Sequence, residues 1–181
     1  MPKIIENLKE RIIEVSKTIL EEQGYNALTS RAISSRCGVA SGTIYNYFES
    51  KEMIVGTIVY DDWKNVLKGI DCKLEKALSK HEGISVIAEE LEGFCADHEK
   101  LWREYAVSKR ATSYYDKGHN MLIEALSKRV EKALGGSDGD QKDRTAAVLS
   151  EALVALAVHG KHYRDYSDIL DKMFDTHGGN I

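Results

Sequence analysis

The stretch TSRAISSRCGVASGTIYNYFESKEMI, residues 29–54, decides how this chain folds. Two short helices fit within it, over residues 30–37 and 41–48, with a sharp corner between them at Gly38. Thr29 can cap the first helix, because its hydroxyl can accept a hydrogen bond from an otherwise unpaired backbone N–H. Gly38 can adopt the left-handed conformation that commonly ends a helix. The stretch therefore predicts a helix-turn-helix.

The second of these helices is expected to have one buried face and one polar face. Ile44 and Phe48 are four residues apart, so both side chains fall on the face that packs inward. The small residues at the start of the helix allow its backbone to approach a partner closely, and its N-terminal amides favour an anion such as phosphate. Ser50 can cap a further helix that begins at Lys51. This layout suits a helix whose N-terminal end enters a DNA groove.

The residues GVASGTIYNYFESKE, 38–52, resemble the signature of the TetR family of bacterial transcription regulators. The flanking sequence fits the resemblance, since a first helix over residues 4–23 precedes the helix-turn-helix. The resemblance covers residues 4–60, while the rest of the chain is similar to that family only in length and helical character. Ala40 departs from the family pattern, which often has a capping serine here, and the missing cap costs about 1 kcal/mol of local helix stability.

The resemblance implies DNA-contacting roles for eight residues. Those expected to face base edges or the nearby backbone are Ser41, Gly42, Thr43 and Asn46. Those expected to contact phosphates are Thr29, Tyr45, Tyr47 and Lys51. Three bland alternatives stay open: Tyr45 packs against the first helix, Lys51 is a solvated surface charge, and Gly42 is only a steric convenience.

The composition indicates a protein of the reducing cytoplasm. The chain has 181 residues, of which 43% are hydrophobic, and its three cysteines are scattered without a C-x-x-C spacing, which argues against a disulfide framework. No basic segment followed by an apolar run marks a secretory signal. The longest apolar run, residues 152–158, is far shorter than the ~20 residues that a membrane span needs. We therefore expect a cytoplasmic protein with no membrane partner.

The charge is distributed as expected for a small DNA-binding headpiece on an acidic body. Residues 1–51 contain 7 Lys and Arg against 6 Asp and Glu, a net charge of +1, and the remainder contains 18 against 23, a net charge of −5. These sum to the −4 of the whole chain. A weakly positive headpiece implies modest non-specific affinity for a duplex, which fits sequence-specific binding.

The rest of the chain reads as helix throughout. A long helix is expected from residue 51 to about residue 80, others over 83–105 and 121–134, and a final amphipathic helix over 163–174. The predicted fold class is all-α, with a three-helix helix-turn-helix headpiece at residues 1–50. A C-terminal ligand-binding and dimerisation bundle at residues 51–181 completes about nine helices.

The helix over residues 145–158 is apolar on nearly every side, because eleven of its fourteen residues are Ala, Val or Leu. In a small chain this favours burial against both its own body and a partner subunit, although a central helix of the monomer remains the alternative. The TetR resemblance implies that the last two long helices of each subunit pair into a four-helix bundle. A two-fold homodimer would bind a palindromic operator in double-stranded DNA. The candidate interface residues are Ala147, Ser150, Val154, Ala157, Val158 and Tyr166.

The body also contains aromatic and histidine side chains of the kind that line small-molecule sites. The candidates for contact with an effector of unknown identity are Trp63, Phe94, His98, Trp102, Tyr105, Tyr115 and His119. The alternative is that most of them are ordinary core and surface residues of a helical bundle. The resemblance implies that a bound effector tilts the helix starting at Lys51 and releases the DNA, so the protein would act as a repressor.

Other classes of function are disfavoured. His159, His162 and Asp165 are spaced three apart and could bind zinc, but Gly160 can break the helix there, so we expect no metal and no cofactor. The chain has no Gly-rich phosphate loop, nucleophile elbow or His-Glu-x-x-His motif, so we expect no enzyme. The competing hypothesis is a ligand-independent DNA-binding dimer for chromosome organisation or division control.

Overall fold

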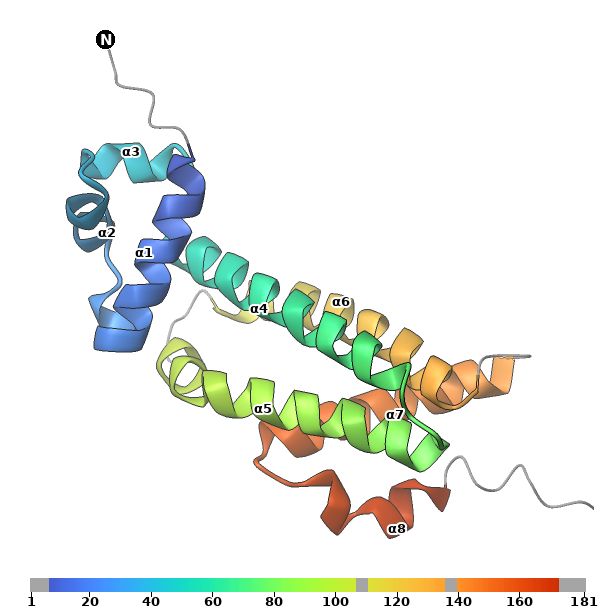
Figure 1. Cartoon of the computed structure of the whole chain (residues 1–181). Coiled ribbons are helices and arrows are strands. Elements are labelled where there is room, and N and C mark those ends of the chain that lie inside the picture. The colour runs from blue at the N-terminus through green and yellow to red at the C-terminus, as the bar shows by residue number, and fades with distance from the viewer. Residues whose placement is uncertain (1–6, 107–110, 136–139, 173–181) are drawn as a thin grey trace, which may run out of the picture. The chain divides into compact units, whose positions relative to one another are not determined.

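The computed structural model of this chain describes residues 7–106, 111–135 and 140–172 (Figure 1). These ranges contain eight α-helices and two short 3-10 helices, without a strand, which confirms the predicted all-α fold class. In chain order they are α1 (Leu8–Gln23), η1 (Tyr25–Ala27), α2 (Ser30–Cys37), α3 (Ser41–Tyr45), α4 (Lys51–Leu74), α5 (Lys80–Ala106), α6 (Ala111–Ala133), α7 (Asp140–Val158), η2 (Tyr163–Asp165) and α8 (Ser167–Leu170).

The chain forms two compact units. The headpiece unit comprises residues 1–62 and 99–112, and the body unit comprises residues 63–98 and 113–181. Three helices supply residues to both units: the headpiece unit takes the first half of α4, the last turns of α5 and the first two residues of α6. Each unit is described by itself below.

The headpiece unit is built on α1, α2 and α3, with α2 in contact with both of the others (Figure 1). Helix α1 packs one side inward, since Ile12 and Ile19 are fully buried. Ile33 of α2, Ile44 of α3 and Phe48 after α3 complete this core. Burying a side chain of this size stabilises a fold by roughly 1.5–3 kcal/mol, so these five residues hold the short helices in place.

Tyr25, directly after α1, connects three segments of the headpiece unit. Its backbone N–H donates to Glu104 Oε2 at 2.6 Å, near the end of α5. Its hydroxyl donates to Glu52 Oε1 at 3.1 Å in the second position of α4. The preceding Gly24 has φ 80°, a backbone conformation that favours glycine, and a Cβ there would also lie 3.0 Å from Glu104 Oε2. The α1 end is thereby tied to both long helices.

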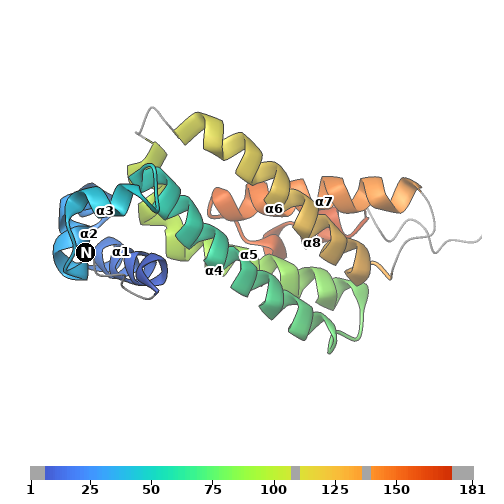
Figure 2. The ribbon, with the colours of Figure 1, turned by 90° about the horizontal axis from the view of Figure 1, so that it is seen from above.

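In the body unit, α4 and α5 run side by side in opposite directions (Figures 1 and 2). A helix from residue 51 to residue 80 was predicted, and its end is wrong, because α4 stops at Leu74. In the turn that follows, the Ser79 hydroxyl accepts a hydrogen bond from the backbone N–H of Glu82 at 3.1 Å. This cap starts a new helix, α5. Arg129 of α6 donates to the carbonyl oxygen of Leu67 at 3.3 Å and so fixes α6 to α4.

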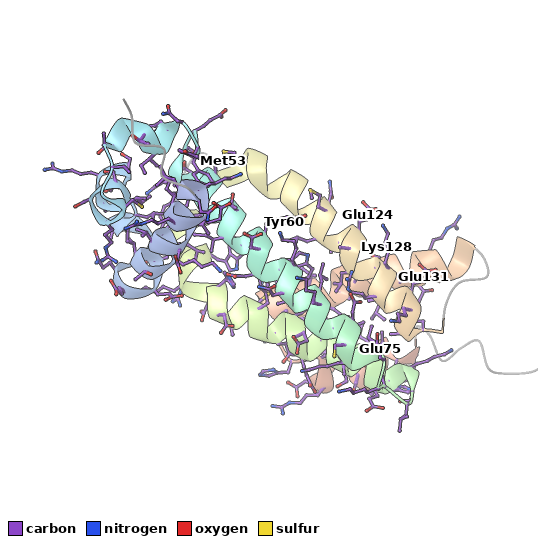
Figure 3. The ribbon with its side chains drawn as sticks, turned by 45° about the horizontal axis from the view of Figure 1, so that its top comes forward. Met53, Tyr60, Glu75, Glu124, Lys128 and Glu131 are labelled. Carbon is purple, nitrogen blue, oxygen red and sulfur yellow. The ribbon has the colours of Figure 1, made fainter. Side chains whose placement is uncertain are left out.

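The core of the body unit is aliphatic. Its fully buried members from four helices include Ile70, Ile84, Ile87, Leu91, Leu126 and Leu149. The outer side of α6 is polar in contrast, and Figure 3 shows Glu124 and Lys128 there, an ion pair of 3.1 Å. Helix α6 is therefore amphipathic.

Helix α7 is buried on one side only. Its buried stripe is Ala146, Leu149, Ser150, Leu153 and Ala157, and its exposed stripe is Ala147, Val148, Glu151, Ala155 and Val158. Ser150 donates to the carbonyl oxygen of Ala146 at 2.7 Å and receives a bond from Ser127 of α6 at 3.2 Å. Ser150 and Ala157 therefore lie in the core of their own unit, and the surface open to a partner is the opposite stripe.

The C-terminal segment differs from the predicted long amphipathic helix over residues 163–174. Gly160, at φ 63°, follows the end of α7, and the chain continues as η2 and the four-residue α8. The predicted residues beyond 172 lie outside the described ranges.

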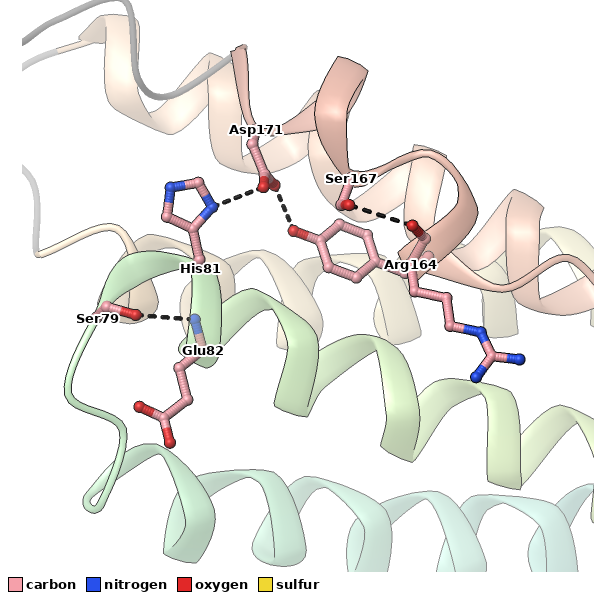
Figure 4. A network of polar contacts seen from close by, with 7 residues as sticks. Ser79, His81, Glu82, Arg164, Ser167 and Asp171 are labelled. Carbon is pink, nitrogen blue, oxygen red and sulfur yellow. Dashed lines mark hydrogen bonds and ion pairs between the residues drawn. The ribbon is translucent and has the colours of Figure 1, made fainter.

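This segment is fastened to α5 by polar contacts (Figure 4). Asp171 binds His81 Nδ1 at 2.6 Å and accepts from the Tyr163 hydroxyl. Glu92 binds His162 Nδ1 at 2.7 Å and accepts from the Tyr163 backbone N–H at 2.8 Å. These contacts hold the segment against α5.

Candidate nucleic-acid interface

The corner between α2 and α3 has the predicted geometry. Thr29 has extended backbone angles, and its hydroxyl accepts from the backbone N–H of Ala32 at 3.1 Å, which confirms it as the N-cap of α2. Gly38 has φ 70° and ψ 34°, in the left-handed region, and ends α2. The backbone N–H of Val39 donates to the carbonyl oxygen of Ser34 at 3.0 Å and closes the turn. The chain thus reverses within three residues.

Helix α3 is shorter than the predicted 41–48, because it covers Ser41–Tyr45 and continues as a turn. Ala40 provides no side-chain cap, as the sequence indicates. A hydroxyl contact of 2.9 Å between Ser34 and Ser41 joins the start of α3 to α2. The backbone N–H of Phe48 still donates to the carbonyl oxygen of Ile44 at 3.0 Å, which brings both side chains to the core.

The residues predicted to contact DNA lie mainly on the outer side of this pair of helices. Those exposed to solvent are Thr29, Ser41, Gly42, Tyr45, Asn46 and Tyr47, while Thr43 and Lys51 are half-buried. Tyr45 is 58% exposed, and its hydroxyl donates to Ser30 Oγ at 3.3 Å at the start of α2. The alternative in which Tyr45 packs against the first helix is therefore not what the structure shows.

Gly42 lies in open space. A Cβ added there meets nothing within 4 Å, so neither packing nor a left-handed backbone requires glycine at this position. The absence of a side chain lets another molecule come within contact distance of the α3 backbone. The interpretation of Gly42 as an internal steric convenience finds no support in the headpiece unit itself.

Lys51 is the first residue of α4 and lies close to Tyr25. Its Nζ lies 3.8 Å from the centroid of the Tyr25 ring, within the range of a cation–π contact. Ser50 accepts from the backbone N–H of Met53 at 3.3 Å and caps α4 as predicted. Burial alone would raise the pKa of Glu52, but hydrogen bonds from its own backbone N–H, Ser50 and Tyr25, with the charge of Lys51, outweigh this and lower it. Glu52 therefore stays ionised at this junction.

The residues proposed for effector binding fall into three groups. Trp63, Phe94 and His98 come together in the body unit, with ring centroids 5.3 Å apart for the first pair and 4.5 Å for the second. Trp102 is half-buried and belongs to the headpiece unit. The side chains of the remaining candidates lie outside the described part of the structure: Tyr105, Tyr115 and His119.

The residues proposed for the dimer interface differ in how far they are exposed. Ala147 and Val158 are exposed, and Val154 and Tyr166 are half-buried. Sequence reasoning missed Val148, which is 56% exposed. The helical period places Val148 on the same side of the helix as Ala147 and Val158. Because nearly all residues of this helix are apolar, the sequence does not show that this side faces outward.

The possible zinc residues are not arranged as a site. His159 follows the end of α7, Asp165 lies in η2, and His162 pairs with Glu92. Among the side chains that the structure describes, no three His, Cys, Asp or Glu gather closely enough to hold a metal ion. Within the same ranges, no helix has both the length and the apolar character needed to cross a membrane.

Comparison with known families places the helix-turn-helix. The family described as "Bacterial regulatory proteins, tetR family" matches residues 12–58, a segment that includes all of α2 and α3. The HTH-type transcriptional regulator UidR of Escherichia coli strain K12 is 30% identical over 59 residues, which are 33% of this chain and 30% of UidR. The fatty acid metabolism regulator protein of Bacillus subtilis strain 168 is 29% identical over 89 residues, 49% of this chain and 46% of that protein. The chain thus matches less than half the length of these curated relatives.

Solved structures extend the similarity of fold to nearly the whole chain. The crystal structure of RolR in complex with resorcinol has a TM-score of 0.62 at 21% identity, and the match covers 96% of this chain and 88% of that one. Thermus thermophilus FadR, a TetR-family repressor in complex with lauroyl-CoA, has a TM-score of 0.61 at 15% identity, with 96% of both chains covered. The solved structures thus show a similar fold, and the family match together with the geometry of α2 and α3 shows that residues 12–58 are a helix-turn-helix domain of the TetR family of transcriptional regulators.

Proposed function

We propose that this protein is a sequence-specific repressor that binds a palindromic operator as a homodimer and leaves it when a small-molecule effector binds. We assign DNA binding to residues 1–50, and effector binding and dimerisation to residues 51–181. The observation that carries the proposal is the division of α3 into two sides. Its outward side has small and polar side chains, and its inward side is held by the buried Ile44 together with Phe48.

The composition of this surface supports a groove contact. Ser41 and Gly42 at the start of α3 are short enough for the backbone to approach base edges, and Asn46 carries the amide that pairs well with adenine. Tyr45 and Tyr47 flank them with exposed hydroxyl-bearing rings that can reach phosphates. Base-reading groups are thus surrounded by groups that position the helix on the duplex.

The dimer is assigned to the exposed stripe of α7. Its alanines and valines, Ala147, Val148, Ala155 and Val158, present an apolar strip that has no cover within the described part of the chain. Small residues on such a strip let two helices pack closely, and a two-fold pairing uses the same strip twice. Two headpieces held in this way would read the two halves of an inverted repeat.

The dimer assignment is tested by sedimentation of Val148→Asp. The charge should shift the protein from dimer to monomer and weaken operator binding while helical content stays unchanged. Leu78→Asp is the matched control, because Leu78 is also an exposed apolar residue, at 94%, but lies in the turn before α5. Dissociation of both variants, or of neither, would remove α7 from the interface.

The effector is assigned to the body unit, where Trp63, Phe94 and His98 form a run of neighbouring rings. RolR has been crystallised with resorcinol and T. thermophilus FadR with lauroyl-CoA, so this fold can hold organic ligands of different size. An effector releases DNA only if it binds the released state more tightly than the DNA-bound state. A ligand-independent DNA-binding dimer for chromosome organisation or division control is the alternative.

Operator selection tests the DNA-binding half of the proposal. Inverted-repeat duplexes retained from a random pool should bind the full chain far better than scrambled duplexes. Asn46→Ala should change which repeat is retained, whereas Asn26→Ala, another exposed asparagine of the headpiece unit, should not. Equal loss of specific and random DNA in Asn46→Ala would refute its base-reading role.

Metabolite screening separates the two functions. A compound that raises the melting temperature and frees the selected operator supports the effector-controlled regulator. Operator binding that no compound in a broad panel weakens would favour the ligand-independent alternative.

A further inference from the structure

We propose that the indole N–H of Trp63 is a hydrogen-bond donor to the effector, and that the effector is a ring-sized apolar molecule carrying an acceptor oxygen, such as an aryl ketone. This inference rests on the proposed effector function and identifies the chemistry of that site. The observation behind it is a buried polar atom that lacks a partner.

Trp63 is 3% exposed, in the middle of α4. Its Nε1 is the only buried side-chain nitrogen or oxygen without a hydrogen-bond partner among the residues that the structure describes. Leaving a buried donor unpaired costs roughly 1–3 kcal/mol, so native proteins nearly always pair such groups. An exception at a single indole calls for an acceptor from outside the chain.

The surroundings of Trp63 indicate the rest of the ligand. Phe94 lies 5.3 Å away between ring centroids, tilted by 59°, and is itself buried. His98 follows at 4.5 Å from Phe94, and its Nδ1 lies 2.9 Å from the carbonyl oxygen of Phe94. Since a carbonyl only accepts, the proton of this bond is on Nδ1. A planar apolar ligand beside Trp63 could pack against this group of rings as the rings pack against one another.

The indole determines which partner donates and which accepts in this hydrogen bond. An indole N–H can donate and cannot accept, so the ligand atom facing it must be an acceptor. A carbonyl oxygen meets this need, and a hydrocarbon of the same shape does not. Matched ligands that differ only in this oxygen therefore test the inference directly.

The experiment uses the full chain labelled with nitrogen-15 and the probes acetophenone and ethylbenzene, which have nearly the same shape. The chain has two tryptophans, so its spectrum contains two indole N–H signals, and Trp63→Phe identifies the one that belongs to Trp63. Acetophenone should move the Trp63 signal downfield, and ethylbenzene should not. Equal shifts from both probes, no shift from either, or a shift confined to the other tryptophan would overturn the inference.

The dissociation constants of the two probes give a second readout. Comparing them separates the loss of the hydrogen bond from the loss of contact area. Trp63→Phe keeps an aromatic ring but removes the donor, so acetophenone should bind roughly threefold to tenfold more weakly than to the wild type. Ethylbenzene binding should change by a smaller factor, because it loses only contact area. Equal losses for both probes would contradict the proposed hydrogen bond.

The outcome is distinguishable from failure of the proposed function. A compound that frees the operator without moving the Trp63 signal would leave the regulator proposal standing and overturn this inference. A protein that binds no inverted repeat would refute the regulator proposal whatever acetophenone does at Trp63.

Discussion

Replacement of Lys51 by methionine tests whether this residue binds a phosphate. The side chain keeps its straight stem above Tyr25 but loses the charge that lies 3.8 Å from the ring centroid. Each lost phosphate contact lowers the slope of log affinity against log salt by about 0.9, so a dimer that loses one contact per subunit should lose about 1.8. Loss of the cation–π contact should lower the free energy of unfolding by about 0.5–1 kcal/mol.

Fluorescence anisotropy of a labelled operator over a range of salt concentrations measures the slope, and urea unfolding measures the stability. Lys51→Arg should restore the slope, because the charge returns. Lys68→Met removes an exposed lysine from the same helix, within the body unit, and should leave the slope unchanged. A wild-type slope in Lys51→Met would refute the phosphate contact. If only the stability falls, the role of Lys51 is the cation–π contact with Tyr25.

Three further predictions concern other parts of the chain. Gly42→Ala should weaken operator binding without lowering the melting temperature. Gly93→Ala, equally open but inside α5, should leave operator binding unchanged and raise the melting temperature, because alanine favours a helix interior; circular dichroism and band shifts measure both variants. Glu104→Ala should lower the free energy of unfolding by roughly 1.5–3 kcal/mol in urea titrations, because the bond from the Tyr25 amide to a carboxylate is lost. Burial raises the pKa of the Cys95 thiol to about 11, so iodoacetamide at mildly alkaline pH should modify Cys95 only after denaturation, as mass spectrometry of its peptide will show.

The helix-turn-helix was predictable because local rules determine it. A threonine hydroxyl at position 29 and a glycine at position 38 fix both ends of α2 through contacts within a few residues. The burial of Ile44 and Phe48 likewise follows from their spacing along the chain. In this region sequence and structure differ only in the length of α3.

The body was less predictable because its decisive contacts join distant residues. The outward side of α7 depends on Ser150 meeting Ser127 in α6, which a nearly uniform run of alanine, valine and leucine does not reveal. The C-terminal segment depends on Asp171 meeting His81, ninety residues earlier. Periodicity alone predicted a long amphipathic helix there, and the chain instead forms the short helices η2 and α8, held by hydrogen bonds to α5 and within the segment.

The junction at Tyr25 affects how mutants of this protein should be interpreted. In a survey of random mutations, defects at Gly24, Tyr25 or Glu104 would group by phenotype with defects on α3, although none of the three is assigned a contact with DNA. Melting temperature would separate the classes, since alleles at this junction lose bonds that hold the headpiece unit together. A genetic map drawn from activity alone would therefore enlarge the apparent DNA-reading surface.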